Sequence, residues 1–487
     1  MIVHYQLTIS MADHMKIKHP LLISAVLVSC VAFGQERCNC LDNLQETIQK
    51  TEENYAGFPD KINPANRARY SQLKNTLQEK AVDSNTPMDC YLLLKEYVNF
   101  FYDKHFRIEY NAQIDSSVID DMHRTDKQFG QTGDHSIEGV WRDVNNTEIA
   151  IIKQGKNTYK AIKRSSENDQ FPKGFVYFTL VKNGDNFSTK LYNRNINVDI
   201  PAKKIGNLLR IWNFQLWAKT GATLSGNEEE EFESWRGNNN GLLFKKLNSD
   251  FSYLKIPTFE NNEGAIHQLV TKSDSAIRNT KYLIIDLRGN GGGSSGWVSL
   301  IPYLATNQID QGETYLRVSK ANVSKKLQDL DGFVNHPIPD DYKKYFPEET
   351  LNRYKKTYKE LPETSETFYP LPSVSFPLDS VLKQPVKVAI LVDEFGGSST
   401  EYFFHLAKQS KKVITYGRPT IGMMDYAGMS NPTKLPFDAF KLYIPIEKSS
   451  WTDANPIDRT GFTPQMVIDE ARENWIDYVM EDLSKIP

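Results

Sequence analysis

A strand, a glycine turn and a helix follow one another in Ala389–Tyr402 (AILVDEFGGSSTEY), and this succession restricts the fold more than any other segment. The apolar run Val388–Val392 is typical of a buried strand. A Gly-Gly-Ser-Ser-Thr turn follows at 396–400, and Glu401–Lys408 is expected to be helical. A serine in such a turn exposes its hydroxyl beside the unpaired N–H groups of the helix N-terminus, which suits a nucleophile next to an oxyanion site. The alternative is an N-cap serine on an ordinary helix.

A second segment of similar design lies upstream, at Tyr282–Trp297 (YLIIDLRGNGGGSSGW). Tyr282–Leu287 predicts another buried strand, and the glycines after it permit positive φ and close backbone approach. No Gly-Lys-Ser/Thr follows, and no acidic residue follows at the distance of a dinucleotide-binding fold. The glycine cluster is therefore better interpreted as a donor of backbone N–H groups to an oxyanion than as a nucleotide site.

The pair of segments IDLRGNGGG and VDEFGGSSTE resembles the C-terminal processing and tricorn-type serine peptidases. The resemblance covers roughly Phe251–Ile468 and an N-terminal helical region, and it implies an α/β catalytic core of the ClpP/crotonase-like type. In that family the nucleophile lies three residues before a Glu that opens a helix, which here implies Ser398 before Glu401. The resemblance implies oxyanion N–H groups from Ser399 and from Gly292 or a neighbouring glycine.

The general base differs between branches of this family. One branch uses a lysine in a T-F-G-K-G segment, but the matching residues 420–424 read TIGMM, with Met423 in the lysine position. The tricorn-like branch uses a histidine and an acidic residue. The segment FFYDKHF places His105 at the histidine position, and IDRTGFTP places Asp458 at the acidic one. The resemblance thus implies a Ser398–His105–Asp458 triad from distant parts of the chain, which triads permit.

Serine, histidine and aspartate each fit the chemistry of a catalytic triad, but His105 and Asp458 also have other interpretations. Serine needs a base to take its proton, imidazole titrates near neutral pH, and a carboxylate on the far ring nitrogen fixes the tautomer. His105 could instead be a surface histidine, and Asp458 a turn residue. Other candidates for the acid and the base are Glu447, Asp453 and His405, although His405, two turns along the helix after Ser398, is expected to pack.

Composition excludes several other classes of protein. The 487 residues allow two to four domains, and 58 basic against 61 acidic residues, with a net charge of −3, give no basic field for nucleic acid. Four cysteines and the absence of H-x-x-x-H or paired C-x-x-C spacings argue against a zinc site. We expect no metal or cofactor. The expected partner is a peptide or protein substrate, and the oligomeric state stays open.

The N-terminus predicts export. From Met15 the chain has a basic stretch and then the apolar run Leu21–Phe33, which fits a signal peptide over 15–34 cleaved near Gln35 and is too short for a stable membrane span. A lipobox with acylated Cys30 is the alternative. Export would place the mature protein in the periplasm or at the cell surface. Outside the cytosol, one disulfide could join Cys90 to either Cys38 or Cys40.

The rest of the chain divides by its periodicity. A helical N-terminal region is expected over 35–130, with helical periodicity over Leu41–Asp126, an antiparallel β domain over 135–225, and the peptidase core over 241–487 with an insertion at 306–380 capping the site. Family members often carry a PDZ domain where the β domain lies, but no G-L-G-F-like loop is present. The sequence thus predicts an exported serine endopeptidase. The alternative is a non-catalytic member that binds peptides or small hydrophobic ligands; another hydrolase is disfavoured because no G-x-S-x-G is present.

Overall fold

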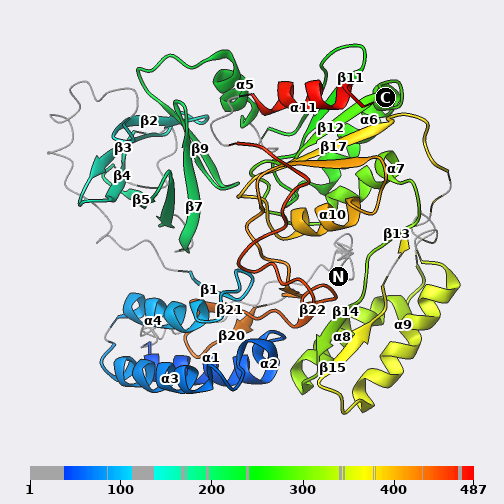
Figure 1. Ribbon diagram of the computed structural model, residues 1–487. Helices are drawn as coiled ribbons and strands as arrows, with labels where there is room; N and C mark the ends of the chain where they lie inside the picture. The colour runs from blue at the N-terminus through cyan, green and yellow to red at the C-terminus, as the bar shows by residue number, and fades with distance from the viewer. Residues whose placement is uncertain are drawn as a thin grey trace, which may run out of the picture.

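The computed structural model describes residues 38–84, 86–111, 136–165, 171, 173–192, 197–236, 241–338, 343, 346–373, 375–376, 378, 380–429, 432–469 and 474–486. Figure 1 shows a parallel sheet with its helices, a barrel beside it, and a second half built from the N-terminal helices and α8–α9. The predicted signal peptide, with Cys30 and Gln35, lies outside the described residues. No helix in the described ranges is long and apolar enough to cross a membrane.

A six-stranded sheet forms the centre of the catalytic core. Its strand order is β10 (Leu243–Lys246), β11 (Phe251–Lys255), β12 (Tyr282–Asp286), β17 (Lys387–Val392), β18 (Val413–Gly417) and β23 (Met466–Val467). The strands are parallel except for β10, which runs antiparallel to β11. The two apolar runs predicted as buried strands are β12 and β17, and they are neighbours in register. The loops after them, which carry the two glycine motifs, therefore leave the same edge of the sheet side by side.

Helices cover both faces of this sheet, which explains why its central strands β12 and β17 consist mainly of buried apolar residues. Leu283 and Ile285 of β12 face the core shared with the helices of one side, while Tyr282 and Ile284 face the other. The first side carries α6 (Glu263–Arg278), η3 (Gly296–Leu300), α7 (Ile301–Leu304) and α10 (Ser399–Ala407), and the other carries α11 (Trp475–Ser484). The prediction of a mixed α/β fold is confirmed.

A closed antiparallel barrel lies between the N-terminal region and the core sheet in the sequence. Its strands are β2 (Gly139–Asp143), β3 (Glu148–Lys153), β4 (Thr158–Ser165), β5 (Val176–Asn183), β6 (Asn186–Leu191), β7 (Asn197–Ile205), β8 (Leu208–Ile211) and β9 (Gln215–Lys219). Large side chains such as Trp141, Phe178 and Trp217 fill its interior. The short helix α5 (Gly226–Ser234) follows and packs Phe232 against the barrel. Closure leaves no unpaired strand at either edge.

The N-terminal helices are α1 (Cys40–Asn54), α2 (Phe58–Lys61), α3 (Arg67–Val82) and α4 (Pro87–Asn99). A disulfide joins Cys40 to Cys90, and of the three cysteines that the structure describes, Cys38 is the free one. The structure differs from the helical prediction after Asn99, because α4 ends there and β1 (Arg107–Tyr110) pairs with β21 (Phe440–Tyr443). β20 (Thr433–Lys434) completes this sheet. The end of the predicted helical segment, residues 112–126, lies outside the described residues. Local sequence patterns do not reveal that β1 pairs with a strand as distant in the chain as β21.

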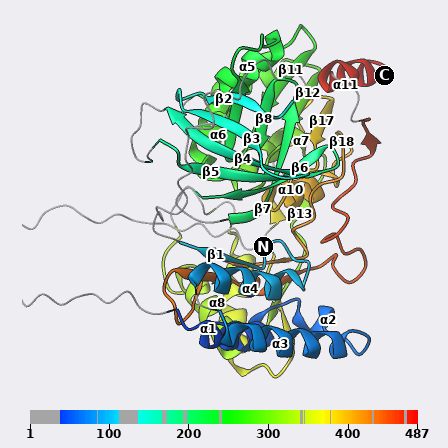
Figure 2. The same cartoon turned by 90° about the vertical axis from the view of Figure 1, so that its left-hand side faces the viewer.

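The insertion at 306–380 packs with the N-terminal helices. It contains β13 (Ile309–Asp310), β14 (Thr314–Arg317), α8 (Lys320–Val334), α9 (Glu348–Glu360), η5 (Leu361–Glu363), β15 (Phe368–Leu371) and β16 (Ser375–Phe376). β14 pairs with β15 and with β22 (Glu447–Ser449), and β19 (Tyr426–Ala427) extends that sheet. Leu316, Leu361 and Leu371 share one core with α1–α4. Figures 1 and 2 show this half of the molecule on the far side of α10 from α11.

Candidate active site

Ser398 occupies a strained turn at the entrance to α10. It is the N-cap residue, with φ 52° and ψ −119°, a backbone conformation that residues other than glycine rarely adopt. Two backbone bonds hold the preceding turn: Gly396 N–H donates to Asp393 O (2.9 Å), and Gly397 N–H donates to Asn290 O (3.1 Å). The second bond ties the two glycine loops together. Strain of this kind concentrates at functional sites and persists only where surrounding contacts enforce it.

His105 lies directly against this serine. Its Nε2 is 2.9 Å from Ser398 Oγ, and its Nδ1 is 2.7 Å from the backbone carbonyl oxygen of Tyr426. A carbonyl oxygen can only accept, so Nδ1 carries the proton in this arrangement and Nε2 is left as the acceptor for the serine hydroxyl. The imidazole is therefore in the tautomer that a general base needs.

The loop between α4 and β1 is built to hold this histidine. Asp103 Oδ1 accepts the backbone N–H of His105 (2.8 Å), and Asp103 Oδ2 accepts the hydroxyl of Tyr55 (2.7 Å). The His105 side chain is buried, and this burial lowers the pKa of its imidazole, although the Asp103 carboxylate partly opposes the effect. A lowered pKa keeps the ring neutral, and competent as a base, at neutral pH.

Asp458 does not take the position expected for a triad acid. Its Oδ2 pairs with Lys61 Nζ, and its backbone N–H donates to Asp425 Oδ2 (2.8 Å), whereas the far nitrogen of His105 binds the Tyr426 carbonyl. Lys61 Nζ also donates to Phe101 O (2.8 Å), at the start of the histidine loop. Burial and the nearby carboxylate of Asp103 raise the pKa of Asp458, with Lys61 opposing. Among the described residues, the far nitrogen of His105 therefore has the Tyr426 carbonyl and not Asp458 as its partner, and Asp458 pairs with Lys61.

The other candidates for acid and base make different contacts. His405 packs its ring against Trp451, with centroids 4.5 Å apart, and against Phe462. Glu447 pairs with the buried Lys326 of α8, and Asp453 pairs with Lys448. The expectation that His405 packs along its helix agrees with these contacts.

The oxyanion side of the site is formed by the two glycine loops. A Cβ added to Gly292 would lie 2.7 Å from Ser398 Cβ and 2.8 Å from Ser399 N, so only glycine fits against the serine. The N–H of Gly292, one of the two expected donors, instead donates to Asn290 Oδ1 (2.9 Å). The next N–H, of Gly293, donates to no group among the described residues. Ser399 begins α10, so its N–H has no intrahelical partner, and its hydroxyl donates to Gly293 O (2.6 Å).

Glu401 binds the loop that follows β18. Its buried carboxylate accepts from Thr420 Oγ1 (2.6 Å), Gly422 N–H (2.7 Å), Met423 N–H (2.8 Å) and Ser398 N–H (3.2 Å). Burial raises the pKa of Glu401 to about 7, although these hydrogen bonds favour its ionised form. The glutamate therefore sets the distance between the serine turn and the 420–423 loop.

A Ser–Lys mechanism has no support among the described residues of this site. Met423 fills the position where the other family branch has its lysine, and its Sδ lies against Gly397. Lys104 is nearby, but its Nζ donates to the carbonyl oxygens of Ile421 (2.8 Å), Gly422 (3.1 Å) and Asp458 (3.0 Å). Among the described residues, the hydrogen-bond partner of Ser398 Oγ is His105.

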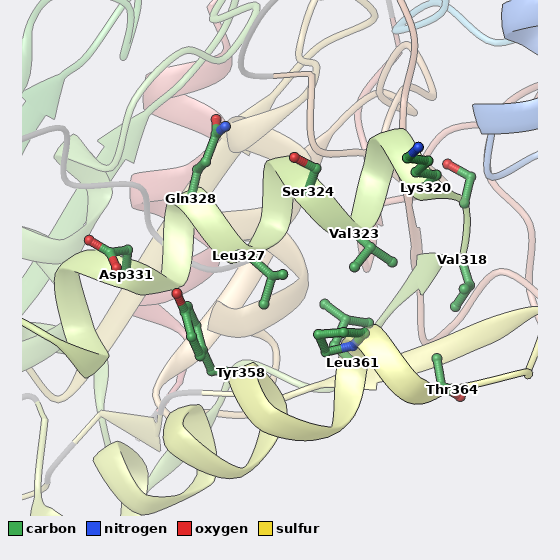
Figure 3. A pocket seen from close by; sticks show the side chains of 12 residues that line it. Val318, Lys320, Val323, Ser324, Leu327, Gln328, Asp331, Tyr358, Leu361 and Thr364 are labelled. Carbon is green, nitrogen blue, oxygen red and sulfur yellow. The ribbon is translucent and has the colours of Figure 1, made fainter.

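A cavity of 810 Å³ lies elsewhere, within the insertion. Figure 3 shows it between α8 and the α9–η5 segment, with Val323, Leu327 and Leu361 on its apolar side and Lys320, Gln328 and Asp331 on its polar rim. Neither Ser398 nor His105 lines it. The serine site is instead a junction of loops.

Sequence reasoning missed the partners that orient the histidine. The Tyr426 carbonyl is backbone and has no signal in the sequence. Asp103, inside the quoted FFYDKHF segment, could have been recognised as a loop-forming Asx residue, because Asp side chains bond backbone N–H groups two residues on. Lys61 had no such signal.

Residues 250–468 match the family model of peptidase family S41. This segment is an S41 peptidase domain. It contains both glycine loops, Ser398 and Asp458, whereas His105 lies upstream of it. The resemblance to C-terminal processing and tricorn-type peptidases is confirmed, and the chain is a serine-type peptidase.

Solved structures of CPAF share this fold. Mature CPAF matches with a TM-score of 0.50 and 11% identity over 92% of this chain and 96% of that chain. CPAF complexed with lactacystin matches with a TM-score of 0.50 and 12% identity over 92% and 97%. The photosystem II D1 C-terminal processing protease matches with a TM-score of 0.37 and 12% identity over 89% and 93%. The search among curated proteins found no match.

Proposed function

We propose that this S41 peptidase is an exported endopeptidase that cleaves peptide bonds by acyl transfer through Ser398, with His105 as general base and acid. The observation that carries the proposal is the 2.9 Å approach of His105 Nε2 to Ser398 Oγ, on a serine held in a strained turn. Nucleophile and base lie within hydrogen-bond reach, and a third group orients the base, which is the arrangement that activates serine.

The geometry supports a sequence of steps. Ser398 Oγ attacks the scissile carbonyl while its proton passes to Nε2, and the resulting imidazolium is stabilised through Nδ1 by the Tyr426 carbonyl. The developing oxyanion would be met by the N–H groups of Ser399 and of Gly293, the neighbour of Gly292. His105 then protonates the leaving amine, and a water activated by the same ring releases the acid product. These steps require no metal or cofactor.

Asp458 has an indirect role in this proposal. Through Lys61 it holds the carbonyl of Phe101 and hence the loop that carries His105. It would therefore position the base and keep no direct contact with the reacting atoms.

Covalent labelling tests the nucleophile. A fluorophosphonate probe should label the purified enzyme at one site, and mass spectrometry of the digested protein should place the adduct on Ser398, because phosphonylation requires an activated serine. Heat-denatured enzyme is the control and should stay unlabelled. A folded enzyme that remains unlabelled would instead support a non-catalytic protein that binds peptides or small hydrophobic ligands in the same cleft.

Export is a separate part of the proposal. The basic stretch after Met15 and the apolar run Leu21–Phe33 support a cleaved signal peptide, so the mature N-terminus should lie near Gln35 and carry no lipid. Intact-mass measurement of the protein purified from both the soluble exported fraction and the membrane fraction checks this. A diacylated Cys30 would overturn it in favour of a surface lipoprotein.

A further inference from the structure

The turn between β8 and β9 joins the barrel to the loops of the serine site. Trp212 Nε1 donates to Phe395 O (2.8 Å), three residues before Ser398. The neighbouring Asn213 Nδ2 donates to Thr258 Oγ1 (3.3 Å), in the loop after β11. That loop pairs with the glycine cluster, since Phe259 N–H donates to Gly292 O (3.0 Å). One barrel turn therefore contacts the serine loop directly and the glycine loop through its neighbour.

Trp212 also lies directly on the glycine loop. A Cβ added to Gly291 would lie 2.6–2.7 Å from Cε2, Cζ2 and Nε1 of the indole, so the ring lies directly against the backbone of that residue. Gly291 is two residues before Gly293, and Phe395 is three residues before Ser398. The indole thus bridges the two loops that carry the proposed oxyanion donors, because it contacts Gly291 of one loop and donates its N–H to Phe395 O of the other.

The barrel makes two further contacts to the same loops. Arg210 packs its guanidinium against Gly289, where a Cβ would lie 2.1 Å from Nη2. Lys203 Nζ pairs with Glu394 Oε1 (2.9 Å), next to Phe395. These contacts come from β7 and β8, so the side of the barrel formed by these two strands supports the glycine loop and the serine loop.

The backbone at Trp212 is itself held in an unfavourable conformation. Its φ is 41°, in the left-handed region that bulky residues rarely adopt. Two hydrogen bonds enforce it: Trp212 N–H donates to Pro201 O (2.9 Å), and Arg210 Nε donates to Trp212 O (2.9 Å). A half-buried tryptophan in a strained turn, placed across two catalytic loops, is the pattern of a residue with a functional constraint.

We propose that Trp212 is a positioning residue of the oxyanion site, through which the barrel fixes the spacing between the glycine loop and the serine loop. The inference rests on the proposed function of Ser398 and extends it to the barrel. Oxyanion donors act only if they are preorganised where charge develops, and small displacements of catalytic groups are costly. Loss of the indole should therefore reduce turnover while substrate binding is retained.

The test compares Trp212→Phe and Trp212→Ala with Ile205→Ala, a control in the same barrel whose side chain is exposed. The phenylalanine variant keeps a ring on Gly291 and loses the N–H to Phe395. We expect kcat to fall about 10-fold for Trp212→Phe and about 100-fold for Trp212→Ala, with KM within about twofold of wild type. The rate of fluorophosphonate labelling at Ser398 should fall in the same order, because the adduct develops a similarly placed charged oxygen. Ile205→Ala should match wild type.

Three outcomes would overturn the proposal. Both Trp212 variants could keep wild-type kcat and labelling rates, or the change could be confined to KM, which would make Trp212 a substrate-binding residue. Alternatively, the loss could follow a lowered Tm and disappear in assays at lower temperature, which would make the contact merely structural. Labelling of the wild-type enzyme separates this proposal from the proposed function. If wild type is unlabelled, the assignment of Ser398 fails; if wild type and the Trp212 variants label equally fast, only the positioning role fails.

Discussion

Replacing Ser398 by alanine should lower kcat by about 10⁵-fold or more while the protein stays folded, because losing the nucleophile removes the whole acyl-transfer route. The change deletes only one hydroxyl, whose hydrogen-bond partner among the described residues is His105. Peptide hydrolysis measured on purified Ser398→Ala, with circular dichroism as the folding check, tests this expectation.

Ser399→Ala is the matched control, one residue along the same turn. Its side chain donates to Gly293 O (2.6 Å), but its proposed catalytic contribution is the backbone N–H, which alanine retains. We expect the loss to stay within about 10-fold, because one hydrogen bond to the glycine loop is removed and the oxyanion donor is not. Near-wild-type hydrolysis by Ser398→Ala, with contaminating proteases excluded, would contradict the proposed mechanism.

Local patterns predicted each glycine motif separately, as a buried strand followed by a glycine turn. That the two motifs form one site was implied by the family resemblance. The structure has β12 and β17 as neighbours, with Gly397 N–H bonded to Asn290 O across the two loops. Family resemblance then indicated Ser398 and His105, which lie far apart in sequence and within hydrogen-bond distance in the fold.

Contacts made by backbone atoms or by distant segments could not be predicted. The carbonyl of Tyr426 orients His105, and any residue type could provide that carbonyl. Asp458 stands at the position that the resemblance implies, yet it pairs with Lys61, because local spacing does not determine which partner a buried carboxylate finds. Closure of the barrel depends on the pairing of β2 with β9, two strands at opposite ends of that region.

Replacing His105 by alanine should cost nearly as much as losing Ser398, because the members of such a unit act together. His405→Ala is the matched control. His405 is the other histidine near the serine helix, but its ring packs on Trp451 and Phe462, so its removal should change stability more than turnover. Added imidazole should restore part of the activity of His105→Ala and none of that of Ser398→Ala, since only the first variant lacks a base and keeps the nucleophile.

Asp458→Asn should have a smaller effect than His105→Ala. The asparagine loses the ion pair with Lys61, but the ring of His105 keeps its bond to the Tyr426 carbonyl. We expect a loss of about 10–100-fold in kcat, from displacement of the histidine loop. A loss as large as that of His105→Ala, measured with the same substrate, would instead place Asp458 in direct contact with the base during the reaction.

The pH profile of kcat/KM provides a test without any substitution. Imidazole must be neutral to accept the serine proton, so activity should rise with pH as His105 loses its proton. Because burial lowers the pKa of His105, this rise should be centred below the ordinary histidine value of about 6.5. Glu401, whose pKa is about 7, ionises in a neighbouring range, and its carboxylate then holds the 420–423 loop. Ionisation of Glu401 should therefore also raise kcat/KM as pH rises. Glu401→Gln should remove this second rise, while the rise at lower pH, from His105, remains. A profile that is flat from pH 4 to pH 8 in both wild type and Glu401→Gln, with the enzyme folded over that range, would contradict the role of His105 as base.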